Sequence, residues 1–411
     1  MKQILIIVLT MVLWHNNGKA QIDKDANFTL SIVADKYYII DKNGDTLKKL
    51  SDLRRVEQFD YRGFAKVTKE AENYLVDTLG NAYRVAYNIE DLTPDIVALD
   101  LSFQNLEALP EIVCQQWQLK VLLLNNNRLT NLPESITKLV NLQTLHLKQN
   151  KLTILSESIN NLINLQTLNL SGNKFSTLPE SVTKLTNLRI LDLSINNLNN
   201  LPESIGKLTN LQELNLGYNR FIALPENITK LSNLRDMNLS NNEFANLPEG
   251  ITKLTNLQVL NLSANRFSTL PESITKLTNL QTLDLSSNTF NTLPESIANL
   301  NKLQILHLLN NQFTVLPESF GKLTNLQVLN LADNQLTTLP ESFGKLTNLK
   351  WLLLNGNQLQ TLPKNITKLT NLQTLALEGN PYLSPYNKQL IGEELKTFLA
   401  KLSKGEIRFG K

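Results

Sequence analysis

The sequence predicts an α/β solenoid, with a parallel β-sheet on its concave face and short helices on its convex face. Three observations lead to this fold class. An asparagine that closes a Leu-x-Leu-x-x-Asn pattern returns every 23 residues, from Asn127 to Asn380. The two leucines before it alternate with period two, which is typical of a short strand. A proline and two apolar residues spaced three apart then follow, which is typical of a short helical segment.

Each repeat must bury its apolar face against its neighbours. With a weaker first copy, in which Gln104 takes the asparagine place, 13 copies follow one another without insertion over residues 93–383. Because strands stack at about 4.8 Å and helices at about 8–10 Å, the stack must curve into a horseshoe. Six phenylalanines at one repeat position are predicted to form a core spine: Phe175, Phe221, Phe244, Phe267, Phe290 and Phe313.

The recurring asparagine is expected to form a structural ladder. Its side-chain amide has donors and an acceptor, so it can bond the backbone of its own loop and of the next copy. The ladder positions are Asn127, Asn150, Asn173, Asn196, Asn219, Asn242, Asn265, Asn288, Asn311, Asn334, Asn357 and Asn380.

The helical segment carries an acid four residues before a lysine, as in Glu272 and Lys276. This order favours an ion pair and suits the helix dipole, and each pair stabilises a helix by about 0.2–0.5 kcal/mol. We interpret these pairs as a solvated outer wall rather than as a catalytic stripe.

The motif LxxLxLxxNxLxxLPxxIxxLxNL, as in residues 257–280, resembles the leucine-rich repeat family over about 290 of the 411 residues. Its LP and IxxL variant is most similar to Ras-binding scaffolds and plant disease-resistance proteins. Two departures occur: Ser156 replaces the proline, and the first copy lacks the asparagine and has Gln116 in a leucine position. An atypical first copy is expected at a cap.

Residues 1–20 have the order of a secretory signal peptide. Lys2 is followed by an apolar run from Ile4 to Trp14 and by a small residue, Ala20, at the expected cleavage site. The run is too short to span a bilayer comfortably. A buried strand and a membrane anchor are the alternatives. The prediction places the mature chain in the periplasm, on the cell surface or outside the cell.

The two ends of the chain differ from the repeats. Residues 21–92 contain YYIIDKNGDTL and ENYLVDTLGNAYRV, whose matching positions lie 36 residues apart, and predict a β module of two related hairpins. GFAKV and YLVD give it a faint resemblance to bacterial WG-type β repeats. This module is either a cap or an independent binding unit. In residues 384–411, the apolar residues Leu395, Phe398, Leu399 and Leu402 predict a capping helix.

The sequence predicts no catalytic, metal or cofactor site. After the signal peptide the histidines are His146 and His307, which lie roughly 30 Å apart along the stack and cannot share a metal or a nucleophile. Cys114 is the one cysteine and is expected to be a small packed residue. Removal of Lys2 and Lys19 lowers the net charge from +3 to +1, which argues against a nucleic-acid partner.

The outward positions of the concave strands carry two distinct clusters. The acidic strip consists of Ile190, Asp192, Ile195, Glu213, Tyr218 and Asp236. The apolar strip consists of Ile305, His307, Leu309, Val328, Trp351 and Leu353. Exposed aromatic and aliphatic residues in a concavity are typical of an interaction hot spot. Between the strand leucines, a row of Asn and Asp either binds a ligand or is a soluble filler copied with the repeat.

The sequence therefore predicts a non-enzymatic, secreted or cell-surface binding protein of a bacterium, without cofactor or transmembrane segment. Its concave face would hold a protein or peptide. One alternative is a glycan, recognised by the Asn and Asp row and Tyr218. The other alternative is an intracellular signalling scaffold, similar to the Ras-binding relatives, which requires a different interpretation of residues 1–20.

Overall fold

The computed structural model describes residues 28–33, 36–41, 46–50, 55–56, 64–69, 72–77, 81–384, 386–404 and 406–407. The chain forms two compact units. The first comprises Met1–Ser102, Pro110–Leu124 and Lys138–Thr144, and the second comprises Phe103–Leu109, Asn125–Thr137 and Leu145–Lys411. The predicted signal peptide, residues 1–20, lies outside the described residues. Within the described part, no helix has the length and apolar character needed to cross a membrane.

The first unit begins with two antiparallel three-stranded meanders that repeat at an interval of 36 residues. The first meander consists of β1 (Phe28–Val33), β2 (Lys36–Asp41) and β3 (Thr46–Leu50), and the second of β5 (Phe64–Lys69), β6 (Glu72–Asp77) and β7 (Ala82–Ala86). The short strand β4 (Arg55–Val56) pairs with β5. The predicted hairpins are β2–β3 and β6–β7, and each is preceded by a strand that the sequence did not predict.

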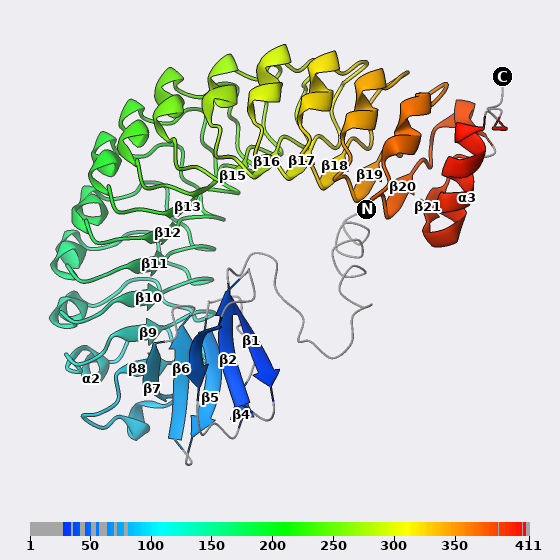
Figure 1. The fold of residues 1–411 in the computed structure, drawn as a ribbon. Coiled ribbons are helices and arrows are strands. Elements are labelled where there is room, and N and C mark those ends of the chain that lie inside the picture. The colour runs from blue at the N-terminus through cyan, green and yellow to red at the C-terminus, as the bar shows by residue number, and fades with distance from the viewer. Residues whose placement is uncertain are drawn as a thin grey trace. The chain divides into compact units, whose positions relative to one another are not determined.

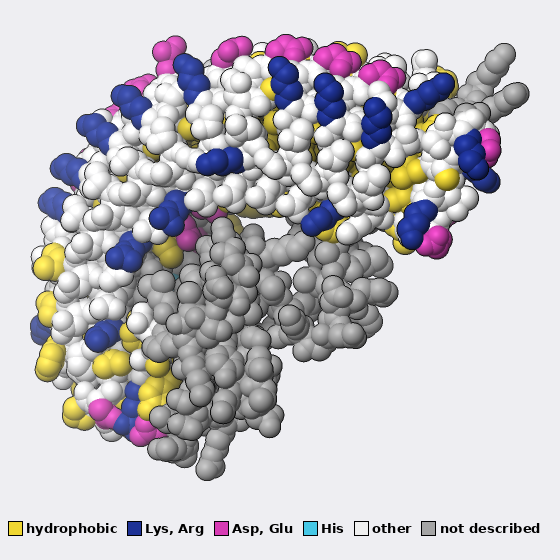
Figure 2. Space-filling view, in the orientation of Figure 1, with side chains coloured by type: hydrophobic (Ala, Val, Ile, Leu, Met, Phe, Trp, Pro, Cys, Tyr) yellow, Lys and Arg dark blue, Asp and Glu magenta, His cyan; other side chains and the backbone are white. Residues whose placement is uncertain are grey.

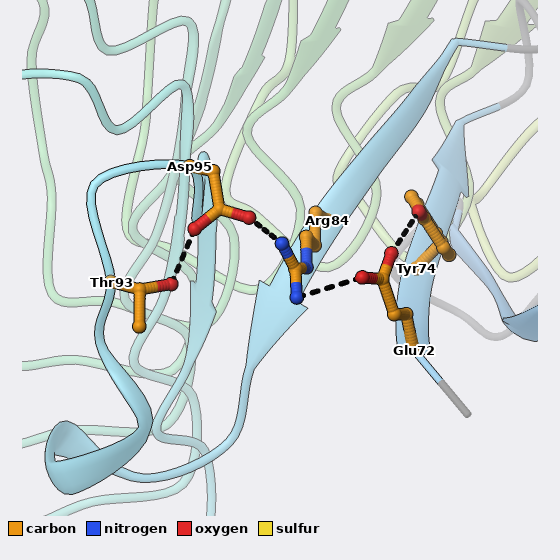
Figure 3. Close-up of polar contacts among 5 residues, drawn as sticks. All are labelled: Glu72, Tyr74, Arg84, Thr93 and Asp95. Atoms are coloured by element: carbon orange, nitrogen blue, oxygen red, sulfur yellow. Dashed lines mark hydrogen bonds and ion pairs between the residues drawn. The ribbon is translucent and has the colours of Figure 1, made fainter. Parts of the chain in front are cut away.

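The second meander joins the sheet of the repeats. After the 3₁₀ turn η1 (Ile89–Asp91), β8 (Ala98–Asp100) pairs in parallel with β7. One buried cluster contains Phe64, Leu75, Val85, Ala98, Val121 and Leu123. Figure 3 shows polar contacts between the same elements: Arg84 forms ion pairs with Glu72, at 2.9 Å, and with Asp95 in the loop before β8. The second meander therefore covers the first repeat strand with a core of its own.

The repeats form a parallel sheet of three-residue strands, each 23 residues after the previous one. After β8 they are β9 (Val121–Leu123), β10 (Thr144–His146), β11 (Thr167–Asn169), β12 (Ile190–Asp192), β13 (Glu213–Asn215), β14 (Asp236–Asn238), β15 (Val259–Asn261), β16 (Thr282–Asp284), β17 (Ile305–His307), β18 (Val328–Asn330), β19 (Trp351–Leu353) and β20 (Thr374–Ala376). In the second unit the strands line the inner side of an arc and the helical turns its outer side (Figure 1), as the sequence predicted.

The short helical segments predicted from the sequence are 3₁₀ turns. They are η2 (Glu134–Lys138), η3 (Glu157–Asn161), η4 (Glu180–Lys184), η5 (Glu203–Lys207), η6 (Glu226–Lys230), η7 (Glu249–Lys253), η8 (Glu272–Lys276), η9 (Glu295–Asn299), η10 (Glu318–Lys322), η11 (Glu341–Lys345) and η12 (Lys364–Lys368). Proline precedes the turn as its cap, and its carbonyl accepts the first bond, as in Ile274 N–H to Pro271 O at 3.0 Å. Ser156, in the proline place, caps its turn with its hydroxyl. The first repeat has the short helix α2 (Glu111–Cys114), in which Cys114 is buried and unbridged.

The predicted ion pairs of the outer wall do not form among the described residues; Glu272 and Lys276, for example, form no ion pair. A 3₁₀ turn has three residues per turn, so positions four apart point in different directions. Several glutamates instead reach the following repeat, where Glu295 accepts from the Ser319 N–H at 3.2 Å. Hydrogen bonds from Ser156 and Ser158 lower the pKa of Glu134 in the same way. Figure 2 shows the acidic and basic side chains in separate rows along the outer rim.

The separation between repeats increases from the sheet toward the outer side. Strands lie about 4.8 Å apart, whereas the ring centroids of Phe267, Phe290 and Phe313 are successively 6.2 and 6.4 Å apart, with nearly parallel rings. All six spine phenylalanines are at most 1% exposed. The wider spacing of the large rings therefore bends the stack, as the sequence predicted for bulkier outer elements.

The second unit ends with a cap that follows η13 (Pro381–Leu383). Strand β21 (Gln389–Ile391) pairs antiparallel with β20, and helix α3 (Gly392–Ser403) packs against β20, β21 and η12. Of the residues predicted to face the core, Leu395, Phe398 and Leu402 are buried and Leu399 is half-buried. The helix therefore covers the last repeat.

Each ladder asparagine bonds the backbone of neighbouring loops. Asn265 Oδ1 accepts from the Phe244 N–H at 3.0 Å. Its Nδ2 donates to the carbonyls of Leu239, Leu262 and Ser263, at 3.0 to 3.1 Å. Equivalent bonds recur from Asn173 to Asn380. One side chain thus bonds four backbone groups of two neighbouring repeats, and its oxygen is the acceptor for the Phe244 N–H.

We expect Asn265→Ala to lower the free energy of unfolding by about 1–3 kcal/mol, because the buried Phe244 N–H loses the side-chain oxygen that accepts its hydrogen bond. Urea unfolding measures the loss, and hydrogen exchange should show added opening around residues 239–265. Asn279→Ala is the matched control, since Asn279 forms two exposed hydrogen bonds, to the Thr255 carbonyl and from the Lys302 ammonium, both at 2.7 Å, and should cost less. Equal losses in the two variants would contradict the ladder.

Candidate functional site

The first and third residues of each three-residue strand point to the inner side of the sheet, and the second residue is buried. The first residues of successive strands form one row of side chains, and the third residues form a second row. The first row holds Ile190, Glu213, Asp236, Val259, Thr282, Ile305, Val328, Trp351 and Thr374. The second row holds Asp192, Asn215, Asn238, Asn261, Asp284, His307, Asn330, Leu353 and Ala376. Because the strands pair without shift, neighbours in a row come from strands about 4.8 Å apart.

The polar side chains of the second row are largely occupied by the protein itself. Asn261 Oδ1 accepts from the Ser263 N–H at 2.9 Å, and Asp284 accepts from the Ser286 N–H at 2.9 Å. The same bond, to the amide two residues later, forms at Asn169, Asp192, Asn215, Asn238 and Asn330. Sequence reasoning weighed ligand binding against simple solubility for this row. The structure adds a third role, which is to close the turn after each strand.

The acidic strip lies on β12, β13 and β14 and the loops that follow them. Ile190, Glu213 and Asp236 are consecutive members of the first row. Asp192 is engaged, because its carboxylate accepts from Ser194 and from Asn169 Nδ2. Glu213 is exposed. Protein atoms of the inner face nevertheless replace part of its hydration, and this desolvation raises the pKa of its carboxyl.

Two arginines border the acidic strip, and sequence reasoning overlooked them. Arg189 and Arg235 directly precede Ile190 and Asp236, and both are exposed. Most other repeats have glutamine in this place, as at Gln258, so the departure from the repeat was a usable signal. The strip therefore combines acids on the strands with cations at their amino ends.

Ile195 and Tyr218 follow β12 and β13 at a position where the repeat adopts left-handed backbone. Their φ angles are 55° and 56°, and Asn241 and Gly172 occupy the same place with φ of 54° and 66°. For a β-branched or aromatic residue this conformation costs roughly 1–2 kcal/mol. Both side chains remain exposed, at 46% and 53%, so little burial offsets the strain.

The apolar strip is continuous in the structure. Ile305, Val328 and Trp351 are consecutive members of the first row on β17, β18 and β19. The remaining members lie beside them, with His307 and Leu353 in the second row and Leu309 in the loop after β17; all six are half-buried. Strands β15 and β16 separate this strip from the acidic strip.

His307 is next to Asp284 in the second row. Burial lowers the pKa of the His307 imidazole, and the nearby Asp284 carboxylate partly opposes this shift. His146 is buried in β10, seven repeats away. Among the described residues, no group of three or more His, Cys, Asp or Glu side chains could hold a metal ion.

Comparison with known proteins agrees with this geometry. A model of the leucine-rich repeat region matches residues 136–220, 156–240, 181–263, 222–312 and 303–397. A second model, of the single leucine-rich repeat, matches residues 118–139. The chain belongs to the leucine-rich repeat family. No curated protein matches this leucine-rich repeat chain.

Solved structures with the same fold include bacterial and plant proteins. A Leptospira interrogans leucine-rich repeat protein, LIC12759, is 37% identical, with a TM-score of 0.66 over 75% of this chain and 82% of its own. An internalin of Listeria monocytogenes, InlF, is 26% identical, with a TM-score of 0.63 over 74% and 85%. The plant peptide hormone receptor RGFR1, in complex with RGF2, is 29% identical, with a TM-score of 0.59 over 70% and 52%. This leucine-rich repeat fold is therefore one that a peptide receptor also uses.

The depressed pKa of His307 predicts acid sensitivity. Between that pKa and the ordinary value near 6.5, the unfolded chain binds more protons than the folded chain, so stability falls as pH falls through this range. We expect His307→Asn, which copies Asn261 and Asn330 of the same row, to reduce the stability lost between pH 7.5 and 5. Urea unfolding at both values measures this. An unchanged pH dependence would contradict the assignment.

Proposed function

We propose that this leucine-rich repeat protein is a secreted or cell-surface, non-enzymatic binding protein of a bacterium, and that its inner sheet face recognises a protein or peptide. The observation that carries the proposal is the pair Ile195 and Tyr218, two exposed apolar side chains held in a left-handed conformation. Strain that persists without a gain in packing points to a function outside the fold.

The surroundings of this pair suit a peptide that combines apolar and charged groups. Glu213 lies between Ile190 and Asp236 in the first row, and its raised carboxyl pKa means that ionisation is costly in the free protein. A cationic side chain placed against Glu213 would remove that cost. Arg189 and Arg235 offer sites for an acidic group at the other edge of the strip. We therefore expect the partner to carry both cationic and acidic groups around an apolar centre.

The comparisons support the same proposal at a coarser level. The RGFR1 structure contains RGF2, and the chain's other relatives include an internalin and a Leptospira protein. These relatives favour protein recognition and a bacterial origin. The signal-peptide pattern of residues 1–20 favours export.

The two alternatives have less support. A glycan on the inner face would have to compete with the backbone for the oxygens of the second row, as at Asn261 and Asp284. An intracellular scaffold remains the other candidate, and it depends on a cytosolic location.

Ile195→Asn and Tyr218→Asn should each keep or raise stability, by up to about 1–2 kcal/mol, because Asn tolerates the left-handed backbone. The same changes should weaken binding by about 2 kcal/mol or more, as hot-spot truncations do. The ligands for this test are peptides selected from a displayed random library on the wild-type mature chain. Thermal unfolding and biolayer interferometry measure the two effects.

Asn241→Gly, at the equivalent position of the next repeat, is the control and should leave peptide binding unchanged. Trp351→Ala tests the apolar strip with the same peptides. Loss of stability together with full retention of binding in the Ile195 and Tyr218 variants would assign these side chains to the fold instead. Loss of peptide binding in the Trp351 variant alone would place the peptide site on the apolar strip instead.

The mature chain is expected to begin at or near Gln21. Expression in a bacterial host with its own export machinery, followed by fractionation and mass spectrometry of the N-terminal peptide, measures this. Intact Met1 on soluble cytosolic protein would remove the export proposal and favour the scaffold alternative.

A further inference from the structure

A second, outer row of asparagines was not predicted from the sequence. Each member of this row lies two residues before the glutamine position of its repeat, as Asn325 lies before Gln327. Its Nδ2 donates to the backbone carbonyl 24 residues earlier, in the previous repeat. Asn325 donates to Asn301 O at 2.6 Å, and Asn348 donates to Thr324 O at 2.9 Å. Equivalent bonds form at Asn141, Asn187, Asn210, Asn233, Asn256, Asn279 and Asn371. These exposed amides are fixed in place by one donated bond, and an amide group has a second N–H and an oxygen that can bond other partners.

Lys302 interrupts this row. It stands where Asn279 and Asn325 stand in the flanking repeats, so it cannot donate an amide to the Thr278 carbonyl. Its ammonium donates instead to Asn279 Oδ1 at 2.7 Å. Lys350 likewise replaces the glutamine found at the same position in neighbouring repeats, such as Gln327 and Gln373. Its ammonium donates to Gln327 Oε1 at 3.1 Å. Both lysines have neutral amide partners, and neither forms an ion pair within the described part of the chain.

The two lysines lie on one trough of about 570 Å³ along the amino ends of strands β17 to β19. Its other lining residues are amides, among them Gln304, Asn325, Gln327 and Asn348, and its lining contains no carboxylate. The volume lies in the range of ligand sites. A row of amide donors and acceptors with two uncompensated cations is suited to a ligand rich in hydroxyl groups that also carries anions.

The spacing of the trough distinguishes between ligand classes. Lys302 and Lys350 belong to repeats two apart, so about 10 Å separates their positions along the stack at about 4.8 Å per strand. An extended peptide presents side chains on one face about every 6.8 Å, a spacing that does not match the spacing of about 4.8 Å between repeats. An extended β-linked pyranose chain advances by close to one repeat per sugar. Two lysines two repeats apart therefore match anions on alternate sugars.

We propose that this trough binds an acidic polysaccharide that carries a carboxylate or sulfate on every second sugar, with Lys302 and Lys350 contacting successive anions and the amides contacting hydroxyl groups. The trough lies at the amino ends of β17 to β19, whereas Ile195 and Tyr218 follow the carboxyl ends of β12 and β13. This second site is therefore independent of the proposed peptide site.

The test uses the mature chain and three oligosaccharides of equal length: hyaluronan, with carboxylates on alternate sugars, chondroitin sulfate, with added sulfates, and neutral chito-oligosaccharide. Calorimetry at low and at physiological salt should show binding of one or both acidic chains, weakened by salt, and at least tenfold weaker binding of the neutral chain. Preference for hyaluronan would identify the carboxylate as the recognised anion, and preference for chondroitin sulfate would identify the sulfate.

The deciding variant is Lys302→Asn/Lys350→Gln, which restores the repeat residue at both positions. It should melt at the same temperature as the wild type or higher, and bind the acidic chains at least tenfold more weakly. Lys322→Gln/Lys345→Gln, which removes two lysines from η10 and η11, is the charge-matched control and should bind normally. Equal weakening in both variants, or no binding of either acidic chain, would overturn the proposal. Ile195→Asn should leave glycan binding intact, so failure here does not affect the peptide site.

Discussion

Each repeat depends on the hydrogen bonds of one asparagine side chain. This side chain bonds backbone groups of the loop that follows the strand, where regular hydrogen bonding between strands ends. Asn265 is typical, since it serves four backbone groups of neighbouring loops. Without this side chain the Phe244 N–H would be buried without an acceptor, at a cost of about 1–3 kcal/mol. The residue before each ladder asparagine has φ between 52° and 70° from Asn126 to Gly379, because the loop must turn sharply to bring the amide inward. Ile195 and Tyr218 occupy this left-handed position, directly before the ladder residues Asn196 and Asn219.

Regular hydrogen bonding leaves few surface positions free, and the proposed sites are found where the sequence departs from the repeat. The second row of the inner face is used to close turns, as at Asn261 and Asp284. The outer asparagine row holds the flank together, as at Asn348. Lys302 stands in the outer row without donating the backbone bond that asparagine makes there, and Ile195 and Tyr218 stand at the left-handed position without the tolerance of Gly or Asn. In a copied repeat, a residue that gives up a hydrogen bond or accepts strain without a gain in packing is the best indication of recognition.

The ends of the sheet are closed in two different ways. In the first unit β7 of the second meander pairs with β8, and Arg84 links the meander to the loop before that strand. In the second unit β21 pairs antiparallel with β20 beneath α3. Both devices remove an open strand edge, which would otherwise be available for association. The first meander repeats the second at an interval of 36 residues and forms a three-stranded sheet of its own.

The sequence by itself determined the features that depend on period alone. A 23-residue interval fixed the parallel register, so the row neighbours Val328 and Trp351 follow from the repeat spacing, together with the phenylalanine spine and the ladder positions. Only the tertiary structure decided the features that depend on a backbone 21 to 26 residues away. The hydrogen bond between Glu295 and the next repeat and the bonds of the outer asparagines belong to this class. Spacing in the sequence specifies which residues are neighbours, but the direction of a side chain, and hence its partner, follows from how two neighbouring loops pack.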